Sequence, residues 1–443
     1  MTAHDTDWAV VGGGILGLTL ALRLAEHGHG VTVYERASEI GGLASSFRLG
    51  DVTWDRFYHV MLQSDTTLRS LLEDLGLEDD IRWATTGTGL YDRGRLFPVS
   101  SAADYLRLPV LGPTAKARIA ATVLRASRTK DWQSLEKVTA EEWLSRWSGR
   151  SAYETFWLPL LRSKLGDRHD QASAAFIWAI MQRLYAARRA GMKQDLFGYV
   201  PGGYARILAR FREVLLERGV VLKTSTGVRS VRAVGEQVEV YTDKGAGMFG
   251  NAVVTAPSLT AARLVPQLSD RERTAHESII YQGIVCLSLL LDVPLGGYYV
   301  TNITDPAIPF TGVIEMTALV DPAEFGGQTL VYLPKYIAPG DVLFDTPDDV
   351  IESSFVDALF EMYPAARVAH IAASAVSRVQ HVLPVATVGY SKRLPPMRTS
   401  VPGVYIVNTA HIVNGTLNVN ETVQLADRVM PDLLAKPGSE QRQ

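Results

Sequence analysis

Hydrophobic positions near the start of the chain follow three successive patterns. Trp8–Val11 is a continuous apolar run, typical of a buried strand. Apolar residues then recur at helical spacing over Ile15–Ala25, and Gly28 is placed to end that helix. A second apolar run, Val31–Tyr34, leads directly into Glu35. The pattern predicts a strand, a helix and a second strand, which is the opening of an α/β fold.

Beyond this unit, helical and strand-like patterns alternate in long blocks. Residues 100–195 are mostly of helical character, and residues 280–335 are rich in β-branched and aromatic runs. Strand signals of the opening type return in the middle of the chain and again near its end. We further expect a helix over 347–361, a buried strand over 404–407 and a final helix over about 419–435. The intervening blocks look like insertions that build a second domain.

Composition narrows the class of protein. The chain has 443 residues, of which 47% are hydrophobic and 21% charged, with a formal net charge of -3. This balance indicates a folded protein and argues against a general nucleic-acid binder. Cys286 is the single cysteine, which excludes an intramolecular disulfide, and no metal-ligand spacing is present, so we expect no metal site. No signal-peptide pattern or spanning apolar run is seen, so we expect a cytoplasmic protein.

The strongest motif joins the first strand to the first helix. Residues 12–17 read GxGxxG. In such a turn Gly12 permits the sharp bend, Gly14 lets the backbone approach a pyrophosphate, and Gly17 lets helix and strand pack closely. The helix N-terminus offers unpaired N–H groups to the phosphate. Glu35 follows Gly17 by 18 residues and is placed to accept the hydroxyls of a ribose.

The motif continues in a longer pattern that resembles a known family. Residues 12–42 read GxGxxGxxxAxxLxxxGxxVxxxExxxxxGG. This resembles the fingerprint of the FAD-binding family that includes monoamine oxidases, protoporphyrinogen oxidases, carotenoid desaturases and UDP-galactopyranose mutases. Weaker matches to the family occur at 199–204, 251–257 and 403–408. The resemblance implies FAD bound non-covalently by Gly12, Gly14, Ile15, Leu16, Gly17, Glu35, Arg36, Gly41, Gly42, Leu43, Ala44, Val228, Asn408 and Val419.

The resemblance also implies a domain organisation. We expect a discontinuous Rossmann-like FAD-binding domain formed by residues 1–95, 196–265 and 395–435. An interleaved α+β substrate domain is then formed by residues 96–195 and 266–394, and residues 436–443 form a loose tail. Only one complete dinucleotide fingerprint is present, which argues against a second, built-in NAD(P) domain.

Two positions depart from the family pattern. Asn408 stands where the family usually carries an acid near the ribityl chain, and an amide adds no negative charge there. Amine oxidases of the family hold a lysine near flavin N5, but the closest match here, Tyr281–Leu287, contains none. Val285 is the expected occupant of that position, which argues against simple amine oxidation by that route.

His59 is the candidate catalytic residue. It lies four residues after Asp55, in a stretch expected near the flavin, and histidine titrates near neutral pH. His59 is therefore either a proton donor or flavin contact, or a hydrogen-bonded structural residue.

Two further groups are candidates for substrate binding. Arg162 and Lys164 follow an apolar run, and such cations can hold a carboxylate or diphosphate. Residues 331–336 place Tyr332, Lys335 and Tyr336 on one strand, where the tyrosines either line a pocket or pack within the sheet.

Three functions are compatible with these features. The family favours an FAD-dependent oxidoreductase that dehydrogenates a small or biosynthetic-intermediate substrate by hydride transfer to flavin. The alternative is a non-redox nucleotide-sugar pyranose–furanose mutase that uses reduced FAD N5 as a nucleophile, with Arg162 and Lys164 holding a diphosphate. A binding protein without flavin chemistry is the third. The partner is a small-molecule substrate, anionic or nucleotide-linked if the basic residues contact it.

Overall fold

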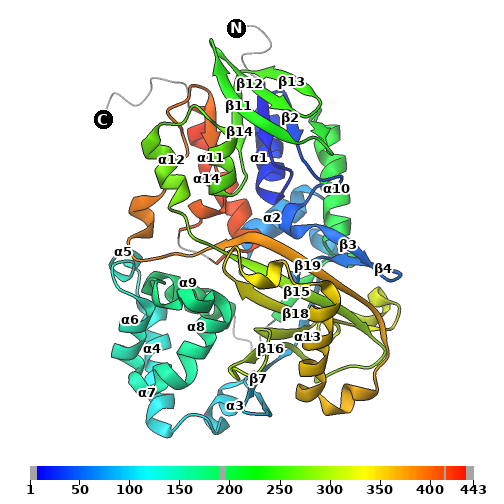
Figure 1. Cartoon of the computed structure of the whole chain (residues 1–443), viewed down its shortest axis with the longest axis vertical. Helices are drawn as coiled ribbons and strands as arrows, with labels where there is room; N and C mark the ends of the chain where they lie inside the picture. Colours follow the sequence, from blue (N-terminus) through cyan, green and yellow to red (C-terminus); the bar gives the residue numbers. More distant parts are fainter. Residues whose placement is uncertain (1–6, 189–195, 414–415, 436–443) are drawn as a thin grey trace.

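The computed structural model describes residues 7–188, 196–413 and 416–435. Three units make up the molecule (Figure 1). A parallel sheet with helices occupies the upper part of the view, a cluster of helices the lower left, and a mixed sheet covered by one helix the lower right. The fold class is α/β, as the sequence predicts.

The parallel sheet assembles strands from distant parts of the chain. Its order is β10-β2-β1-β14-β20, and every pairing is parallel. The strands are β1 (Trp8–Val11), β2 (Val31–Tyr34), β10 (Val221–Lys223), β14 (Asn251–Val254) and β20 (Val404–Ile406). Because both faces of such a sheet are covered, the inner strands β2, β1 and β14 are mostly apolar and buried.

Different layers cover the two faces of this sheet. On one face, apolar residues of α1 (Ile15–Glu26), α10 (Gly203–Glu217) and α14 (Val419–Leu434) form a common core with Val10 and Val33. On the other face lie α11 (Ser258–Leu264) and an antiparallel sheet. That sheet consists of β11 (Val228–Val234), β12 (Gln237–Thr242) and β13 (Gly245–Phe249). The helix α12 (Asp270–Glu277) follows α11.

The second large sheet has seven strands in the order β19-β15-β18-β17-β16-β7-β8. They are β7 (Gly87–Asp92), β8 (Arg95–Pro98), β15 (Tyr281–Leu291), β16 (Tyr298–Ile303), β17 (Gly312–Glu315), β18 (Thr329–Ile337) and β19 (Ile371–Pro384). The helix α13 (Asp348–Met362) covers one face. The other face packs against Trp54 and Phe57, which belong to the segment that follows the glycine motifs. All eleven residues of β15 are buried, because the strand is covered on both faces.

Helices between residues 102 and 188 form the third unit. They are α3 (Ala102–Arg107), α4 (Pro113–Arg128), α5 (Trp132–Leu135), α6 (Ala140–Ser148), α7 (Arg150–Ala152), α8 (Leu158–Leu165) and α9 (Ala174–Arg188). Trp143 and Trp157 lie in their common core, and Trp157 Nε1 donates to Ser148 Oγ at 3.0 Å. A capping box in which Thr139 and Glu142 bond each other's backbone N–H groups begins α6.

Short elements connect the three units. They are β3 (Ser46–Leu49), β4 (Val52–Asp55), β5 (Met61–Leu62), α2 (Thr66–Asp74), β6 (Arg82–Thr85) and β9 (Leu196–Tyr199). The strands β3 and β4 form a hairpin, whereas β9 pairs with both β5 and β6.

One predicted domain boundary is placed too late. The first segment of the FAD-binding domain was expected to run to residue 95, but β7 and β8 belong to the seven-stranded sheet. The strand β16 (Tyr298–Ile303) pairs in parallel with β7. A partner about two hundred residues away in the chain therefore holds β7 in this sheet. The expected tail, residues 436–443, lies outside the described residues.

Candidate cofactor and substrate site

Packing within the protein requires two of the motif glycines. Gly12 has a φ of +119°, and a β-carbon built there would lie 2.4 Å from Thr255 Oγ1. A β-carbon on Gly17 would lie 2.0 Å from the carbonyl oxygen of Gly12. Both distances are shorter than van der Waals contact, so these glycines let the first strand, the turn and α1 come together.

Gly14 is different, because the protein leaves the space in front of it open. Its φ of -76° and ψ of 172° suit any residue. The nearest heavy atom to a β-carbon built there is Gly42 Cα, at 3.9 Å. Gly14 is also the N-cap of α1, which has no side-chain cap and no acidic residue in its first turn. The first N–H groups of Ile15 and Leu16 therefore lack intrahelical acceptors beside an open space, which suits an anion.

A second glycine pair lies against the first motif. Gly41 N donates to Gly13 O at 2.7 Å, and Gly14 and Gly41 form an isolated parallel bridge. Gly42, with a φ of +58°, approaches so closely that a β-carbon on it would lie 3.1 Å from Gly14 Cα. Leu43 and the buried Ala44 complete the short helix Gly42–Ala44. The two glycine segments thus form one backbone-lined cradle.

Glu35 is held by backbone N–H groups at the carboxyl end of β2. Gly13 N donates to its Oε2 and Ala37 N to its Oε1, both at 2.7 Å. A carboxylate accepts about four hydrogen bonds, so lone pairs remain for two ribose hydroxyls. Arg36 is exposed, and its Cγ lies 3.8 Å from a β-carbon built on Gly227, the residue before Val228. The predicted contacts at Arg36 and Val228 are therefore neighbours at this edge.

Two predicted cofactor contacts, Asn408 and Val419, come after β20, the edge strand of the parallel sheet. Asn408 is buried, and its side chain is used inside the protein: Nδ2 donates to Ala256 O at 3.0 Å, and Oδ1 accepts from Ala410 N at 3.1 Å. The Asn408 amide is therefore not presented to a ligand. Val419 is the first residue of α14, whose N-cap is Asn418.

Taken together, these residues fit a dinucleotide. The glycines of the cradle leave a space in which a pyrophosphate can approach the backbone, and side chains at these positions would fill that space. The N-terminus of α1 supplies hydrogen-bond donors. Glu35 supplies acceptors at the expected distance along the chain.

His59 lies in a buried polar cluster at the end of β4. Its Nδ1 lies 2.8 Å from Phe57 O and 3.8 Å from Asp55 Oδ2. Burial lowers the pKa of His59 to about 4, so the ring is neutral at pH 7. With Nδ1–H donated to the Phe57 carbonyl, Nε2 is left as an acceptor. The neutral ring can accept a hydrogen bond at Nε2, and its bond to Phe57 O fits the alternative of a hydrogen-bonded structural histidine.

Asp55, beside His59, is fully buried and was not among the predicted site residues. Tyr204 N donates to Asp55 Oδ1 at 2.7 Å, and the Tyr332 hydroxyl donates to the Asp55 carbonyl. Burial raises the pKa of the Asp55 carboxyl to about 8, and the Tyr204 N–H opposes this only in part. A β-carbon on Gly203 would lie 2.8 Å from Asp55 Oδ1, so the glycine admits this carboxyl to the start of α10. In the sequence, the four-residue spacing to His59 was the only indication that Asp55 belongs to the site.

The three candidates on β18 separate onto two faces of the sheet. Tyr332 is 0% exposed and has no surface for a substrate, so it packs within the sheet. Lys335 and Tyr336 are adjacent and therefore point to opposite faces. Tyr336 is partly exposed, and its hydroxyl lies 2.8 Å from that of Tyr58. Tyr332 and Tyr336 both lie on the side of the sheet that packs against the segment after β4, and of these two only Tyr336 is partly exposed.

Arg162 and Lys164 are not brought together either. Positions two apart on a helix do not share a face, and Arg162 is exposed whereas Lys164 is partly buried. The Lys164 ammonium lies 5.6 Å from the centroid of the Tyr336 ring. A second cation, Arg183 on α9, lies nearby and pairs with Asp65 at 3.0 Å. The cation near Lys164 is therefore Arg183, which is paired with Asp65, and not Arg162 as expected.

Comparison with known proteins decides the family. The model of the flavin-containing amine oxidoreductases matches residues 17–423. The chain belongs to this family. Carotenoid phi-ring synthase from Streptomyces griseus is 29% identical over 60% of this chain and 56% of its own length. Zeta-carotene desaturase from Synechocystis sp. is 24% identical over 81% of this chain and 83% of its own length. The match thus spans about half the length of the first of these relatives.

Solved structures of the family share the fold. A candidate protoporphyrinogen oxidase from Exiguobacterium sp. 255-15 superimposes with a TM-score of 0.78 and 19% identity, over 97% of this chain and 98% of that one. Membership of the flavin-containing amine oxidoreductase family implies an enzyme with a flavin cofactor, and this agrees with the cradle.

The structure changes which residue of β15 corresponds to the lysine of the family's amine oxidases. Val285 was the expected occupant of the lysine position, but it lies in the core between the sheet and α13. Its neighbours Ile284 and Cys286 lie on the opposite face, in the core that includes Tyr332 and Trp54. Alternation along β15 therefore places Cys286, not Val285, on the side of the candidate site. Burial raises the pKa of the Cys286 thiol, so it stays protonated.

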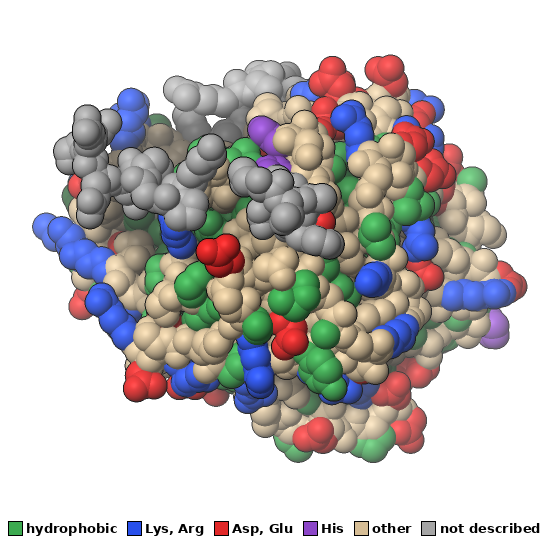
Figure 2. Space-filling model, turned by 90° about the horizontal axis from the view of Figure 1, so that it is seen from above, with side chains coloured by type: hydrophobic (Ala, Val, Ile, Leu, Met, Phe, Trp, Pro, Cys, Tyr) green, Lys and Arg blue, Asp and Glu red, His purple; other side chains and the backbone are tan. Residues whose placement is uncertain are grey.

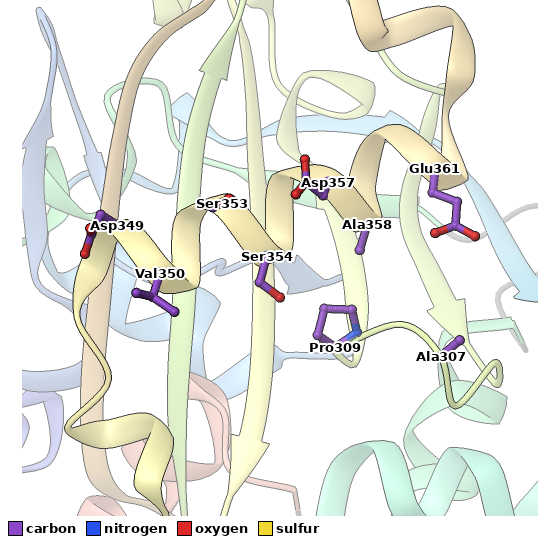
Figure 3. A pocket seen from close by; sticks show the side chains of 9 residues that line it. All are labelled: Ala307, Pro309, Asp349, Val350, Ser353, Ser354, Asp357, Ala358 and Glu361. Carbon is purple, nitrogen blue, oxygen red and sulfur yellow. The ribbon is translucent and has the colours of Figure 1, made fainter.

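A separate hollow of about 760 Å³ lies on the far side of the sheet (Figure 3). It is lined by one face of α13 and by Ala307 and Pro309, and its charged groups, Asp349, Asp357 and Glu361, are all acidic. The seven-stranded sheet separates it from Tyr58 and Tyr336, so it is not part of the candidate site.

Surface features agree with the composition. Acidic and basic side chains are interspersed over the face in Figure 2, without an extended region of one sign. Within residues 7–188, 196–413 and 416–435, no cluster of three metal-ligating side chains is present. In the same part of the chain, no helix is long and apolar enough to cross a bilayer.

Proposed function

We propose that this protein is an FAD-dependent oxidoreductase that binds FAD non-covalently and dehydrogenates a small organic substrate. The observation that carries the proposal is the cradle at Gly14, which is open in front although nothing in the protein's own packing requires glycine there. Such a position is explained by a ligand that approaches the backbone. The uncapped start of α1 and the free lone pairs of Glu35 support the same ligand.

Bound FAD would supply the acceptor for a hydride from the substrate. The chain's own residues would do the rest. Glu35 would hold the adenosine ribose, and the first N–H groups of α1 would hold the pyrophosphate. His59, neutral and with Nε2 unprotonated, would accept a hydrogen bond from the substrate. Cys286 is buried inside β15, so we expect no covalent attachment of the flavin through a cysteine.

The position of the substrate follows from where the three units meet. Tyr58 follows β4, Tyr336 belongs to the seven-stranded sheet, and Lys164 belongs to the helical unit. Ligand sites form preferentially at such domain interfaces. We therefore place the substrate against Tyr58, Tyr336 and Lys164.

The first test is the flavin itself. The purified protein is denatured, and the released cofactor is separated and identified by mass. FAD in the supernatant, near one per chain, supports the proposal, whereas FMN, covalently retained flavin or a colourless protein contradicts it. A colourless protein would favour the third function, a binding protein without flavin chemistry. Anaerobic mixing with candidate substrates then tests the redox step, because a true substrate bleaches the flavin absorbance.

The mutase alternative loses one of its supports, because Arg162 lies on the exposed side of α8 and Lys164 on the inner side. It can still be tested with the same protein. Melting temperatures are compared for the oxidised and the dithionite-reduced enzyme, with and without nucleotide sugars. A shift that appears only on reduction would favour the mutase, since a ligand stabilises the state that it binds.

A further inference from the structure

Lys164 is a mostly buried ammonium group that has no counter-ion among the residues that the structure describes. Its Nζ faces the ring of Tyr336 at 5.6 Å from the centroid. In the part of the chain that the structure describes, no carboxylate oxygen lies within ion-pair distance of it, although the other cation nearby, Arg183, is paired with Asp65. Burial, and secondarily the charge of Arg183, lower the pKa of Lys164. The fold thus holds a cation where an uncompensated charge is unfavourable.

Polar groups around Lys164 also have unused hydrogen-bonding capacity. The hydroxyls of Tyr58 and Tyr336 lie 2.8 Å apart, so one donates to the other and the second proton is available to a ligand. Gln282 is 1% exposed, and its Oε1 has no hydrogen-bond partner. The Gln282 amide lies beside Gly166, two residues after Lys164, since Nε2 is 3.4 Å from a β-carbon built on that glycine. Because Gln282 Oε1 is an acceptor, it would take a hydrogen-bond donor of the ligand and not a carboxylate oxygen.

The charge of the site specifies the ligand. Arg183 is already neutralised by Asp65, and Arg162 points away, which leaves one uncompensated positive charge. One ammonium with one or two tyrosine hydroxyls matches a group with a single negative charge, whereas a diphosphate would need more cations. A cationic amine would add a second positive charge beside Lys164 in a region of low dielectric constant.

We propose that Lys164, together with Tyr58 and Tyr336, binds a carboxylate of the substrate. This inference rests on the proposed function and adds the substrate class: an organic acid rather than an amine. The carboxylate would lie between the end of α8, the end of β18 and the segment after β4, and it would orient the rest of the substrate.

Three probes of similar size test this: benzoate, benzamide and benzylammonium. They share an aromatic body and differ in charge. Their dissociation constants are measured on the purified holoenzyme by calorimetry and, in parallel, by perturbation of the flavin absorbance. A hydrogen bond to a charged group is typically the stronger kind, so we expect benzoate to bind about tenfold or more tightly than benzamide, with benzylammonium weakest.

Three variants make the test specific. Lys164→Met should reduce the benzoate-to-benzamide ratio to about one, whereas Lys164→Arg should keep most of it, because the charge is conserved. Arg162→Met removes a cation from the exposed side of the same helix and should leave the ratio unchanged. Flavin content and melting temperature are recorded for each variant, so a folding defect is recognised separately.

Several results would overturn the inference. These are failure of the wild-type protein to bind benzoate, equal or tighter binding of benzylammonium, and a ratio that survives Lys164→Met. Calorimetry needs no flavin signal, so the carboxylate site is tested even if the protein contains no FAD. Failure of the proposed function would instead appear as missing flavin with a normal benzoate-to-benzamide ratio.

Discussion

Replacing Gly14 by alanine tests whether glycine at this position is needed for binding a ligand or for folding of the chain. The backbone at Gly14 is extended, and a β-carbon there meets only Gly42 Cα, at 3.9 Å, which is an ordinary contact. Gly→Ala at a compatible position stabilises a protein by roughly 0.4–1 kcal/mol, because the unfolded chain loses freedom. Alanine is a poorer N-cap than glycine, which opposes this gain, so the flavin-free Gly14→Ala protein should lie within about 1 kcal/mol of the wild type.

The loaded protein should behave in the opposite way. A cofactor present at about one thousand times its dissociation constant stabilises the native state by about 4 kcal/mol. If the added methyl group occupies the pyrophosphate position, Gly14→Ala loses most of this stabilisation, and the bulkier Gly14→Val loses all of it. The measurements are the flavin-to-protein absorbance ratio after purification and urea unfolding with and without added FAD.

Gly17→Ala is the matched control. Its β-carbon would lie 2.0 Å from Gly12 O, so the turn must distort, and we expect the flavin-free protein to lose several kcal/mol of stability. Stoichiometric flavin in Gly14→Val would refute the placement of the pyrophosphate. Equal destabilisation of the flavin-free Gly14→Ala and Gly17→Ala proteins would show that Gly14 serves packing after all.

Three further changes test the surroundings of the site. Glu35→Ala removes the acceptor of the Gly13 and Ala37 N–H groups and of the ribose, so FAD titration of the flavin-free protein should show affinity reduced at least about tenfold; unchanged affinity would contradict the assignment. Asp55 has its pKa raised to about 8 in the folded state, so its contribution to stability is complete below pH 4 and is lost as the pH rises toward 8. Urea unfolding at pH 5 and 8 should show a smaller fall for Asp55→Asn than for the wild type, and parallel pH profiles would exclude this explanation. Tyr332→Phe should lower stability by about 1–2 kcal/mol with normal flavin content, because its hydroxyl bonds the Asp55 carbonyl; flavin loss without loss of stability would instead place it in the pocket.

The cofactor side of the site was predictable because its parts are local. The residues from Trp8 to Gly42 form a strand, a turn, a helix, a strand and a second glycine turn, and each step depends on neighbours along the chain. The glycines of the turn constrain the backbone directly, so their positions reveal the ligand. Glu35 follows because the end of a parallel strand lies beside the turn that precedes its neighbour.

The substrate side could be predicted only in part. Pleating and helical geometry already separate Lys335 from Tyr336 and Arg162 from Lys164, but the chain alone does not tell which member faces the cleft. That choice is made by long-range packing: α13 covers one face of β18, and the segment after β4 covers the other. Asn408 illustrates the same limit. The sequence does not tell whether its amide binds a ligand, and in the fold the amide is bonded to the backbone of Ala256 and Ala410.

Tertiary structure alone also created the chemical character of the polar residues. Asp55 and His59 have ordinary side chains, and burial between two sheets shifts their pKa values in opposite directions, because a region of low dielectric constant disfavours both charged forms. Lys164 is likewise distinctive only because α8 places it against the Tyr336 ring, where no other described residue supplies a counter-ion. Local sequence can specify a backbone that receives a cofactor, whereas desolvation and charge balance arise from contacts between segments hundreds of residues apart.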